Sequence, residues 1–396
     1  MAIKFIDEAN IEGKKVIARF DFNVPLSKDA NPTITDTTRI DMALKTINFI
    51  LEKGASKLIL MSHLGRPKGQ FDEKYSLEPV AAYLSEKLGQ DVVLTESCTD
   101  SGIKSYLGFN ESKVILLQNL RFHPEETSND HEFAKKLASY ADLYVNDAFG
   151  TAHRKHASTY EINTFFKGRA YGGFLLQSEI DALNKIVERP TTPFIGIVGG
   201  AKVSDKIKII EKLLVSVDKL LIGGAMAYPF LKAQGHDIGT SLCADEDLKL
   251  AKNILALPYK SKIVLPTDHL ASEEFGGAPV QVNEKDIPEN LMGLDIGPNT
   301  LELYRSHLAS AKTVLWNGPM GLFENEVYSK GTFGIAETLS ELQNAFTLVG
   351  GGDSVAAVNK AKLADKISHV STGGGASLEY IENGTLPGIK ALRFGI

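Results

Sequence analysis

The chain has 396 residues, of which 43% are hydrophobic and 23% are charged, an ordinary globular composition long enough for two domains with separate cores. Its 43 Lys and Arg against 49 Asp and Glu give a formal net charge of −6, which argues against nucleic acid as a main partner. The first residues lack the apolar core of a signal peptide, and no apolar run is long enough to span a bilayer. We therefore expect a cytoplasmic protein with no membrane partner.

Cys98 and Cys243 form no C-x-x-C pair and indicate neither a disulfide framework nor a zinc site.

In the first half, short runs rich in Val, Ile and Leu predict strands, each followed by a stretch with helical character. These runs cover 16–20, 58–61, 114–117 and 143–145. They lead into the polar segments RFDFNVP, SHLGRP, QNLRFHP and NDAFGTAHRKH. Polar residues therefore lie where the predicted strands end.

These segments, together with the predicted helix start TTRIDMA, supply a set of basic side chains: Arg19, Arg39, His63, Arg66, Arg121 and Arg154, with Asp21 and Asn23 beside them. The planar guanidinium matches carboxylate and phosphate oxygens, so several arginines together would hold a small anionic acid. For any one of them alone, a surface ion pair is the commoner explanation. We interpret His63 as a binding residue only and give no metal role to His153 and His156.

A stretch between the two halves predicts one long helix. Apolar residues recur at near-helical spacing from Leu175 to Val187, after Tyr171-Gly172-Gly173 and before Pro190, where a helix is expected to stop. We expect this helix to connect two domains.

In the second half, the predicted strands at 194–198, 220–222, 314–316, 347–349 and 369–370 end in glycine pairs, triplets or a Gly-Pro-Met-Gly turn. Glycines let backbone approach a ligand closely and leave a following helix N-terminus open to anions. Strand and helix alternate along the chain, which predicts an α/β fold with parallel sheets flanked by helices. Ligands of such sheets bind beyond the carboxyl ends of the strands.

Charged residues in the glycine loops suggest a phosphate-binding site. Lys202 and Lys206 would lie four residues apart on the first turns of a predicted helix, where cations oppose the helix dipole unless a polyphosphate is bound. Asp353 starts another predicted helix and would suit Mg²⁺, although it has an equally good explanation as a helix cap. Glu324 would accept hydrogen bonds from ribose hydroxyls or be a surface acid. No Walker or dinucleotide-binding glycine signature is present.

The segments RFDFNVP, SHLGRP, NLRFH, NDAFGTAHR, GGAKVSDKI, WNGPMGLFE, GGGDS and STGGGAS resemble, in order and across nearly the whole chain, those of the phosphoglycerate kinase family. The resemblance implies two Rossmann-like lobes joined by a hinge helix. The first lobe would be an N-terminal phosphoglycerate-binding domain (1–172). The second would be a C-terminal nucleotide-binding domain (173–384), which includes the interdomain helix at 173–190. A last segment (385–396) would pack back on the first domain. It further implies reversible phosphoryl transfer between ATP and 3-phosphoglycerate, with Mg²⁺ accompanying ATP or ADP. The sequence leaves the oligomeric state open, and since nothing in it asks for more than a monomer, we expect a monomer.

The resemblance also assigns roles by position. The phosphoglycerate would be held by Asp21, Asn23, Arg39, His63, Arg66, Arg121 and Arg154. The nucleotide would contact Lys202, Lys206, Gly223, Gly224, Gly293, Asn317, Glu324, Gly351, Gly352, Asp353 and Ser354, with Asp353 as the metal ligand. Gly373, Gly374 and Gly375 would offer a helix N-terminus to phosphate. Arg39 and Lys202 would stabilise the migrating phosphoryl group.

The implied reaction needs no general base, because its nucleophile is a carboxylate that is already ionised at neutral pH. Positioning and cationic stabilisation would then suffice. Two alternatives are a dehydrogenase, which would need the glycine fingerprint that is missing, and a non-catalytic two-lobed binder of a small acid. The binder would have no use for Lys202, Lys206 and Asp353.

Overall fold

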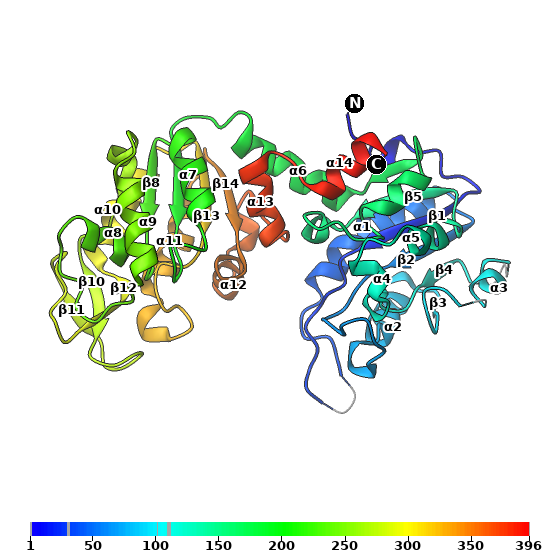
Figure 1. Ribbon diagram of the computed structural model, residues 1–396, viewed down its shortest axis with the longest axis horizontal. Coiled ribbons are helices and arrows are strands. Elements are labelled where there is room, and N and C mark those ends of the chain that lie inside the picture. The colour runs from blue at the N-terminus through cyan, green and yellow to red at the C-terminus, as the bar shows by residue number, and fades with distance from the viewer. Residues whose placement is uncertain (1, 30–31, 101, 109–111, 396) are drawn as a thin grey trace. The chain divides into compact units, whose positions relative to one another are not determined.

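The structure is a computed structural model that describes residues 2–29, 32–100, 102–108 and 112–395. The chain divides into two compact units (Figure 1). Unit 1 comprises Met1–Asp181 together with Thr385–Ile396, and unit 2 comprises Ala182–Gly384. Among the described residues, no helix combines the length and the apolar content that crossing a bilayer requires.

Unit 1 is built on a six-stranded sheet of order β3-β4-β2-β1-β5-β6, and every neighbouring pair in it is parallel. The strands are β1 (Lys15–Phe20), β2 (Lys57–Met61), β3 (Val92–Leu94), β4 (Val114–Leu116), β5 (Leu143–Asp147) and β6 (Ala170–Gly172). The helices are α1 (Thr38–Glu52), α2 (Glu78–Leu88), α3 (Ile103–Gly108), α4 (Pro124–Thr127), α5 (His131–Ala138), the first part of α6 (Phe174–Val187), and α14 (Pro387–Phe394).

The core of unit 1 follows from the pattern of its elements. Strands β2, β4 and β5 are buried along their whole length, as expected for parallel strands covered on both faces. Helix α1 buries Ile40, Ala43, Ile47 and Ile50, which recur every three or four residues and so form one face. The same hydrophobic cluster includes residues of α2 and of β1.

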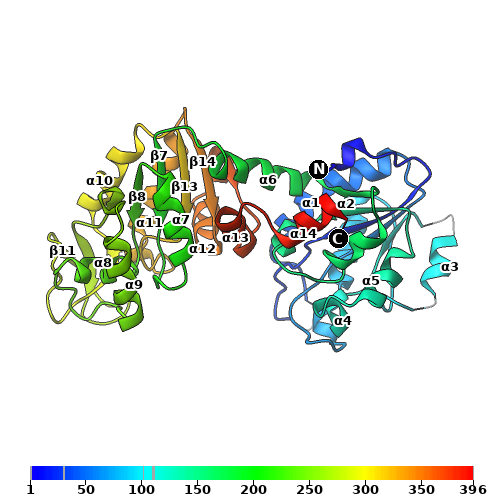
Figure 2. The same cartoon turned by 45° about the horizontal axis from the view of Figure 1, so that its top comes forward.

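Helix α14 belongs to unit 1 although it comes last in the chain. It lies beside the other elements of that unit in both views (Figures 1 and 2). The backbone N–H of Gly388 donates to the carbonyl of Ala152 at 2.8 Å, and a Cβ on Gly388 would meet Ala152 atoms at 3.2 Å. Backbone approaches backbone closely here, which a residue without a side chain permits.

Unit 2 has a second six-stranded parallel sheet, of order β15-β14-β13-β7-β8-β9. Its strands are β7 (Phe194–Val198), β8 (Lys219–Ile222), β9 (Ile263–Val264), β13 (Thr313–Asn317), β14 (Phe346–Gly350) and β15 (His369–Val370). Its helices are the end of α6, α7 (Ile207–Ser216), α8 (Ala227–Ala233), α9 (Asp245–Leu255), α10 (Pro298–Leu308), α11 (Lys330–Glu341), α12 (Gly352–Lys360) and α13 (Gly375–Asn383). Trp316 of β13 is fully buried in the core.

These two sheets confirm the predicted α/β class with parallel sheets flanked by helices. The predicted strands match β1, β2, β4 and β5 in unit 1 and the corresponding strands in unit 2, and the predicted linking helix is α6. The boundary between the units falls inside α6. A hinge role for this helix stays a prediction.

The expectation that strand and helix alternate throughout was wrong in one region of unit 2. Strands β10 (His269–Ser272), β11 (Val280–Val282) and β12 (Met292–Ile296) form an antiparallel sheet of order β11-β10-β12. Two of the three residues in β11 are exposed, so no continuous apolar run marks this strand in the sequence.

Candidate functional site

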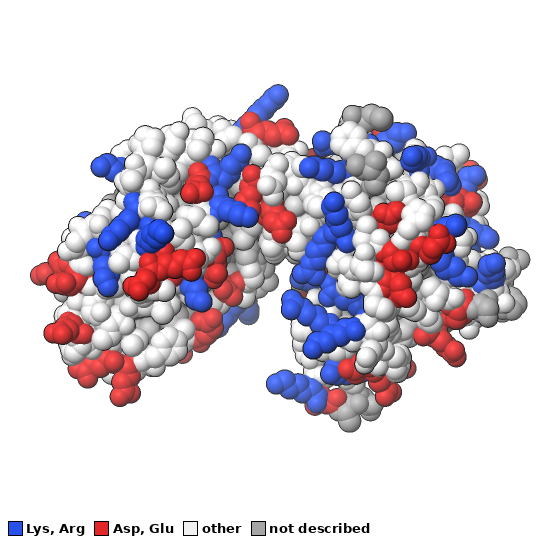
Figure 3. Space-filling view, in the orientation of Figure 1, with Lys and Arg blue, Asp and Glu red and all other residues white. Residues whose placement is uncertain are grey.

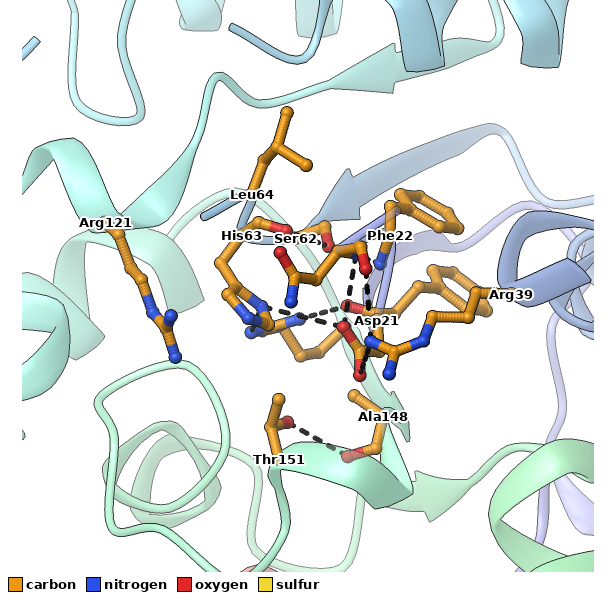
Figure 4. Close-up of polar contacts among 12 residues, drawn as sticks. Asp21, Phe22, Arg39, Ser62, His63, Leu64, Arg121, Ala148 and Thr151 are labelled. Carbon is orange, nitrogen blue, oxygen red and sulfur yellow. Dashed lines mark hydrogen bonds and ion pairs between the residues drawn. The ribbon is translucent and has the colours of Figure 1, made fainter. Parts of the chain in front are cut away.

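In unit 1, polar side chains from separate elements meet at the carboxyl ends of β1 and β2. Asp21 follows β1, His63 follows β2, and Arg39 lies in the first turn of α1. Nη1 of Arg39 donates to Oδ2 of Asp21 at 3.0 Å and to the carbonyl of Asn23 at 3.2 Å. Figure 4 shows Asp21, Arg39 and His63 turned toward one another. The Asp21 carboxylate therefore fixes the position of the Arg39 guanidinium.

Asn23 and Arg121 extend this cluster across the loop after β2. The side-chain oxygen of Asn23 accepts from the N–H of Gly65 at 2.8 Å, and Nη1 of Arg121 donates to the carbonyl of the same Gly65, also at 2.8 Å. Arg121 lies in the short helix after β4. Loops from three neighbouring strands are thus joined through one glycine.

Arg121 is largely buried, and its Nε has no hydrogen-bond partner among the described residues. Burial, and then the nearby Arg19 and Arg154, lower the pKa of Arg121 to about 10. The group stays protonated at neutral pH, so the cluster holds several positive charges close together. A bound anion would relieve both the repulsion and the missing hydrogen bond.

The remaining predicted residues of unit 1 are Arg154 and Arg66. Arg154 lies in the loop after β5, and its Nε donates to Nε2 of His153 at 3.1 Å; its charge acts on both His63 and Arg121. Arg66 is exposed on the loop after β2. Figure 3 shows Lys and Arg side chains gathered along one edge of unit 1.

In unit 2, a pocket of ≈ 430 Å³ opens among the glycine loops. Its lining residues are Gly200, Ala201, Gly224, Ala225, Thr240, Leu242, Phe275, Met292, Gly293, Leu294, Pro319, Gly321, Leu322, Glu324 and Asp353. The predicted residues Gly224, Gly293, Glu324 and Asp353 are therefore brought together. This volume suits a small-molecule ligand.

Close side-chain neighbours explain one glycine that lines the pocket, Gly293, and one that lies outside its lining, Gly351. At Gly293, the hydroxyl of Tyr228 occupies the space that a Cβ would need. Gly351 precedes α12 with a φ of 87°, in the region that favours glycine, and a Cβ there would meet Asn317. The open first turn of α12 carries Gly352 and Asp353.

Lys206 and Asn317 form a polar pair beside the pocket. Nζ of Lys206 donates to the side-chain oxygen of Asn317 and, at 3.4 Å, to its carbonyl. Burial lowers the pKa of Lys206 to about 8, against the opposing effect of Asp353. Nδ2 of Asn317 is buried and has no partner among the described residues. An ammonium and a free N–H donor here suit phosphate oxygens.

The predicted helical placement of the two lysines was wrong. Helix α7 begins at Ile207, with Lys206 as its N-cap residue, so Lys202 lies in the preceding loop and is exposed. The segment 199–205 contains bends and turns and no helix. The two ammonium groups therefore do not share a helix face.

Five other predicted positions have clear surroundings. Ser354 is fully buried, and its hydroxyl accepts from the N–H of Gly318 at 2.6 Å, so it supports the loop after β13. Gly223 packs against Met320. Gly373 and Gly374 precede α13, which begins at Gly375, and none of these three glycines lines the pocket.

The apolar side of the pocket is not among the residues predicted from the sequence. Leu242, Phe275, Met292 and Leu294 line it, and Phe275 is 71% exposed while Leu242 is 54% exposed. Exposed apolar side chains around a pocket indicate a flat apolar ligand surface, such as a nucleotide base. These residues come from turns and from the antiparallel sheet. In these segments the sequence shows no regular spacing of apolar residues that would have indicated them.

Two α/β units, one with a cluster of cationic side chains and one with a glycine-lined pocket, are typical of transferases that hold two substrates on separate surfaces. The sequence model of a family described as phosphoglycerate kinase matches residues 6–384. The phosphoglycerate kinase of Anaeromyxobacter dehalogenans is 53% identical over 99% of both chains. The chloroplastic phosphoglycerate kinase of Volvox carteri is 51% identical over 98% of this chain and 85% of its own.

Solved structures give the same result. The phosphoglycerate kinase of Coxiella burnetii superposes with a TM-score of 0.88 at 39% identity, covering 99% of this chain and 98% of the other. That of Pyrococcus horikoshii gives 0.84 at 31% identity, covering 99% of both chains. This chain belongs to the phosphoglycerate kinase family, and it is accordingly a phosphotransferase with ATP and ADP as co-substrates.

Proposed function

We propose that the cationic cluster of unit 1 binds 3-phosphoglycerate and that the pocket of unit 2 binds ATP or ADP, so that a phosphoryl group moves reversibly between ATP and the substrate carboxylate. The products are 1,3-bisphosphoglycerate and ADP. The carboxylate oxygen forms the new bond to phosphorus, and the bond to the bridging oxygen of ADP breaks. No proton has to be removed from the nucleophile.

The observation that carries the substrate assignment is the excess of positive charge around Asp21. Arg39, Arg121 and Arg154 act on one small region, and Arg121 keeps an unpaired buried N–H. A ligand with both a carboxylate and a phosphate offers enough acceptor oxygens for these groups. Asp21 and Asn23 hold the loops in place and also present oxygens to substrate hydroxyls.

On the nucleotide side, we assign the phosphates to Lys206, Lys202, Asn317 and the first turn of α12. The N–H groups of Gly352 and Asp353 are in that turn, and a helix N-terminus favours anions. The base would lie on the apolar side of the pocket beside Gly293. Glu324 would accept hydrogen bonds from the ribose, and Gly373, Gly374 and Gly375 offer a second helix N-terminus to phosphate.

The residues present fit a magnesium ion that arrives with the nucleotide. Asp353 is exposed at the pocket wall, and Mg²⁺ is commonly held by one or two carboxylates together with phosphate oxygens and waters. In the described part of the chain, no group of three or more His, Cys, Asp or Glu forms a metal site of its own. Asp353 would be the protein ligand, and the ion would offset charge on the phosphate oxygens.

Transfer requires the two substrates to meet, so we further propose that the units close on each other about α6 and exclude water from the reacting groups. In the closed state, Arg39 and Lys202 would stabilise charge on the phosphoryl oxygens during transfer. We also propose that the protein acts as a monomer in the cytoplasm. Sedimentation of the purified protein tests the oligomeric part.

The direct test is a coupled assay of phosphate exchange between 3-phosphoglycerate and ATP on the purified chain. We expect turnover that depends on both substrates and on magnesium. Titration with MgADP alone addresses the competing function of a non-catalytic binder of a small acid. Such a binder would give no heat with MgADP and no exchange, and that pair of results would contradict the proposal.

A further inference from the structure

One charged side chain in unit 1 is completely enclosed by protein. The guanidinium of Arg19, the fifth residue of β1, is fully buried. Its Nη1 donates to the carbonyl of Phe20, and its Nε donates to the hydroxyl of Ser158 at 2.9 Å. A buried cation is costly unless an opposite charge and hydrogen bonds compensate it.

The compensating charge is Glu126, which is also fully buried. The hydroxyl of Ser158 donates to Oε1 of Glu126 at 2.6 Å, and the N–H of Ser158 donates to Oε2 at 3.0 Å. Ser158 thus accepts from the cation and donates to the anion. Glu126, Ser158 and Arg19 form a continuous hydrogen-bonded series, which we call the buried relay.

The buried relay ends at His63. Nη2 of Arg19 lies 3.1 Å from Nδ1 of His63, and Oδ1 of Asp21 lies 3.8 Å from the same nitrogen. Arginine can only donate a hydrogen bond, so Nδ1 must accept and cannot carry a proton. A proton on Nδ1 would instead require a bond to Asp21, which lies beyond normal hydrogen-bond distance.

The surroundings of His63 favour its neutral form. Burial is the main cause that lowers the pKa of His63 well below its ordinary value, and the charges of Arg19, Arg121, Arg154 and Arg39 act in the same direction. Asp21 is the acid that faces the ring. With Nδ1 occupied as an acceptor, the ring proton of neutral His63 must be on Nε2.

We propose that the buried relay of Glu126, Ser158 and Arg19 locks His63 as the neutral imidazole protonated on Nε2, so that His63 presents one N–H donor to an oxyanion of the bound substrate. In the described part of the chain, the ring contacts of His63 with Arg19 and with Asp21 are both made at Nδ1, not at Nε2. Arg19, Ser158 and Glu126 are positioning residues, because they act on the ligand only through His63. The identity of the oxyanion rests on the proposed function; the ring state does not.

The test begins with the full-length protein without ligand, labelled with ¹⁵N in its histidines. Long-range proton–nitrogen spectra distinguish the two neutral ring forms from the charged one, and the signals of His63 are assigned by their loss in His63→Gln. We expect a neutral ring with its proton on Nε2, unchanged between about pH 8 and about pH 6. A proton on Nδ1, or a charged ring at neutral pH, would overturn the proposal even before any variant is made.

A charge-balanced double variant tests the role of the buried relay. Arg19→Met with Glu126→Gln removes both buried charges together, which is better tolerated than removing one. We expect the titration midpoint of His63 to rise by about one pH unit or more, because Asp21 becomes its nearest charged partner. Ser139→Ala, at an exposed serine of the same unit, is the control and should leave the midpoint unchanged.

Ser158→Ala provides a milder break if the double variant does not fold. It should raise the KM for 3-phosphoglycerate several-fold more at about pH 8, where the unlocked neutral ring can carry its proton on Nδ1, than at about pH 6, where a charged ring keeps its proton on Nε2, with little change in kcat. An equal effect at both pH values, with an unchanged ring state, would mean that the relay is only structural. If the spectra agree but the coupled assay shows no exchange, the proposed substrate is wrong and the ring state still stands.

Discussion

Arg39 combines a fixed position with a free face. Its side chain is 39% exposed although Nη1 is held by Asp21, so its other nitrogens remain available to a ligand. An arginine acting on a transferring phosphoryl group contributes at the lower end about a thousandfold to turnover. We therefore expect Arg39→Ala to lower kcat by about that factor in steady-state kinetics.

Arg39→Lys is the matched control, since it keeps the charge and loses the planar fork. Its activity should fall between the wild type and Arg39→Ala. A loss below about tenfold in Arg39→Ala would show that the residue does not act on the phosphoryl group.

Lys206 gives the site a pH dependence with a defined sign. Burial lowers the pKa of Lys206 from 10.5 to about 8, so the free protein loses this ammonium as the pH rises through that value. We expect the affinity for MgADP, measured by calorimetry, to fall about tenfold between pH 7 and pH 9. Lys206→Arg should remove most of this slope, because arginine stays charged. A flat wild-type profile would contradict a phosphate contact by Lys206.

The same lowered pKa affects stability in the opposite sense. Between about 8 and 10.5, the unfolded chain binds more protons at Lys206 than the folded chain does. The contribution of this group to the free energy of unfolding therefore rises with pH across that window. Deprotonation of Lys206 therefore does not destabilise the fold in this pH window. Weaker nucleotide binding at high pH would thus reflect the loss of a contact to the ligand, not unfolding caused by Lys206.

Asp353 is exposed, so its replacement separates binding from folding. Asp353→Asn removes the carboxylate that would hold magnesium, and we expect MgADP binding to weaken by at least about tenfold, or about 1.4 kcal/mol. The free energy of unfolding should change by less than about 1 kcal/mol, the size of a helix-dipole interaction. Equal nucleotide affinities by calorimetry, with and without the carboxylate, would rule out this metal ligand.

Helix α11 is held against β12 by a buried carboxylate. Oδ2 of Asp295 accepts from the N–H of Gly331 at 2.8 Å, and a Cβ on Gly331 would run into Asp295 and Ile296. We expect Gly331→Ala to lower the free energy of unfolding by about 1–3 kcal/mol through overpacking, measured by urea titration. Gly108→Ala, where an added Cβ meets nothing within 4 Å, is the control. If Gly331→Ala is as stable as this control, α11 can move away from β12 and the expected overpacking does not occur.

The elements that could be predicted from the sequence are those whose burial leaves a pattern. Strands such as β2 and β7 are buried at every residue, so they read as uninterrupted apolar runs, and the residues that follow them belong to the site. Strand β11 has only one buried residue and leaves no such run. The start of α7 was also misjudged, because GGAKVSDK contains nothing that distinguishes a turn from a first helical turn.

The site itself was predictable only in part, for a related reason. Arg39 and Asp353 lie beside recognisable strand ends or helix starts. Phe275 and Leu242 enter the pocket from irregular segments, and the buried relay joins Glu126 and Ser158 to Arg19 across more than 100 positions of sequence. Such contacts depend on how the sheet orders its strands, which no local pattern contains.

At the scale of the whole molecule, the two proposed binding sites belong to separate units, so the proposed transfer depends on closure. We expect small-angle scattering to show a smaller radius of gyration when 3-phosphoglycerate and a non-hydrolysable ATP analogue are bound together than with either alone. Closure would exclude water that otherwise hydrolyses the acyl phosphate. The Arg39→Ala variant, with one substrate contact removed, is the comparison. Identical scattering curves with and without both ligands would contradict closure.

The hydrogen bond from Gly388 to Ala152 has a consequence for synthesis. Unit 2 is one uninterrupted stretch, whereas unit 1 consists of two stretches that are more than 200 residues apart. As the chain leaves the ribosome, every residue of unit 2 emerges before α14 does. Synthesis of unit 1 thus begins first and is completed last. Until α14 emerges, the carbonyl of Ala152 lacks its hydrogen bond from the N–H of Gly388. A truncated chain that ends at residue 384 would contain all of unit 2 but only part of unit 1.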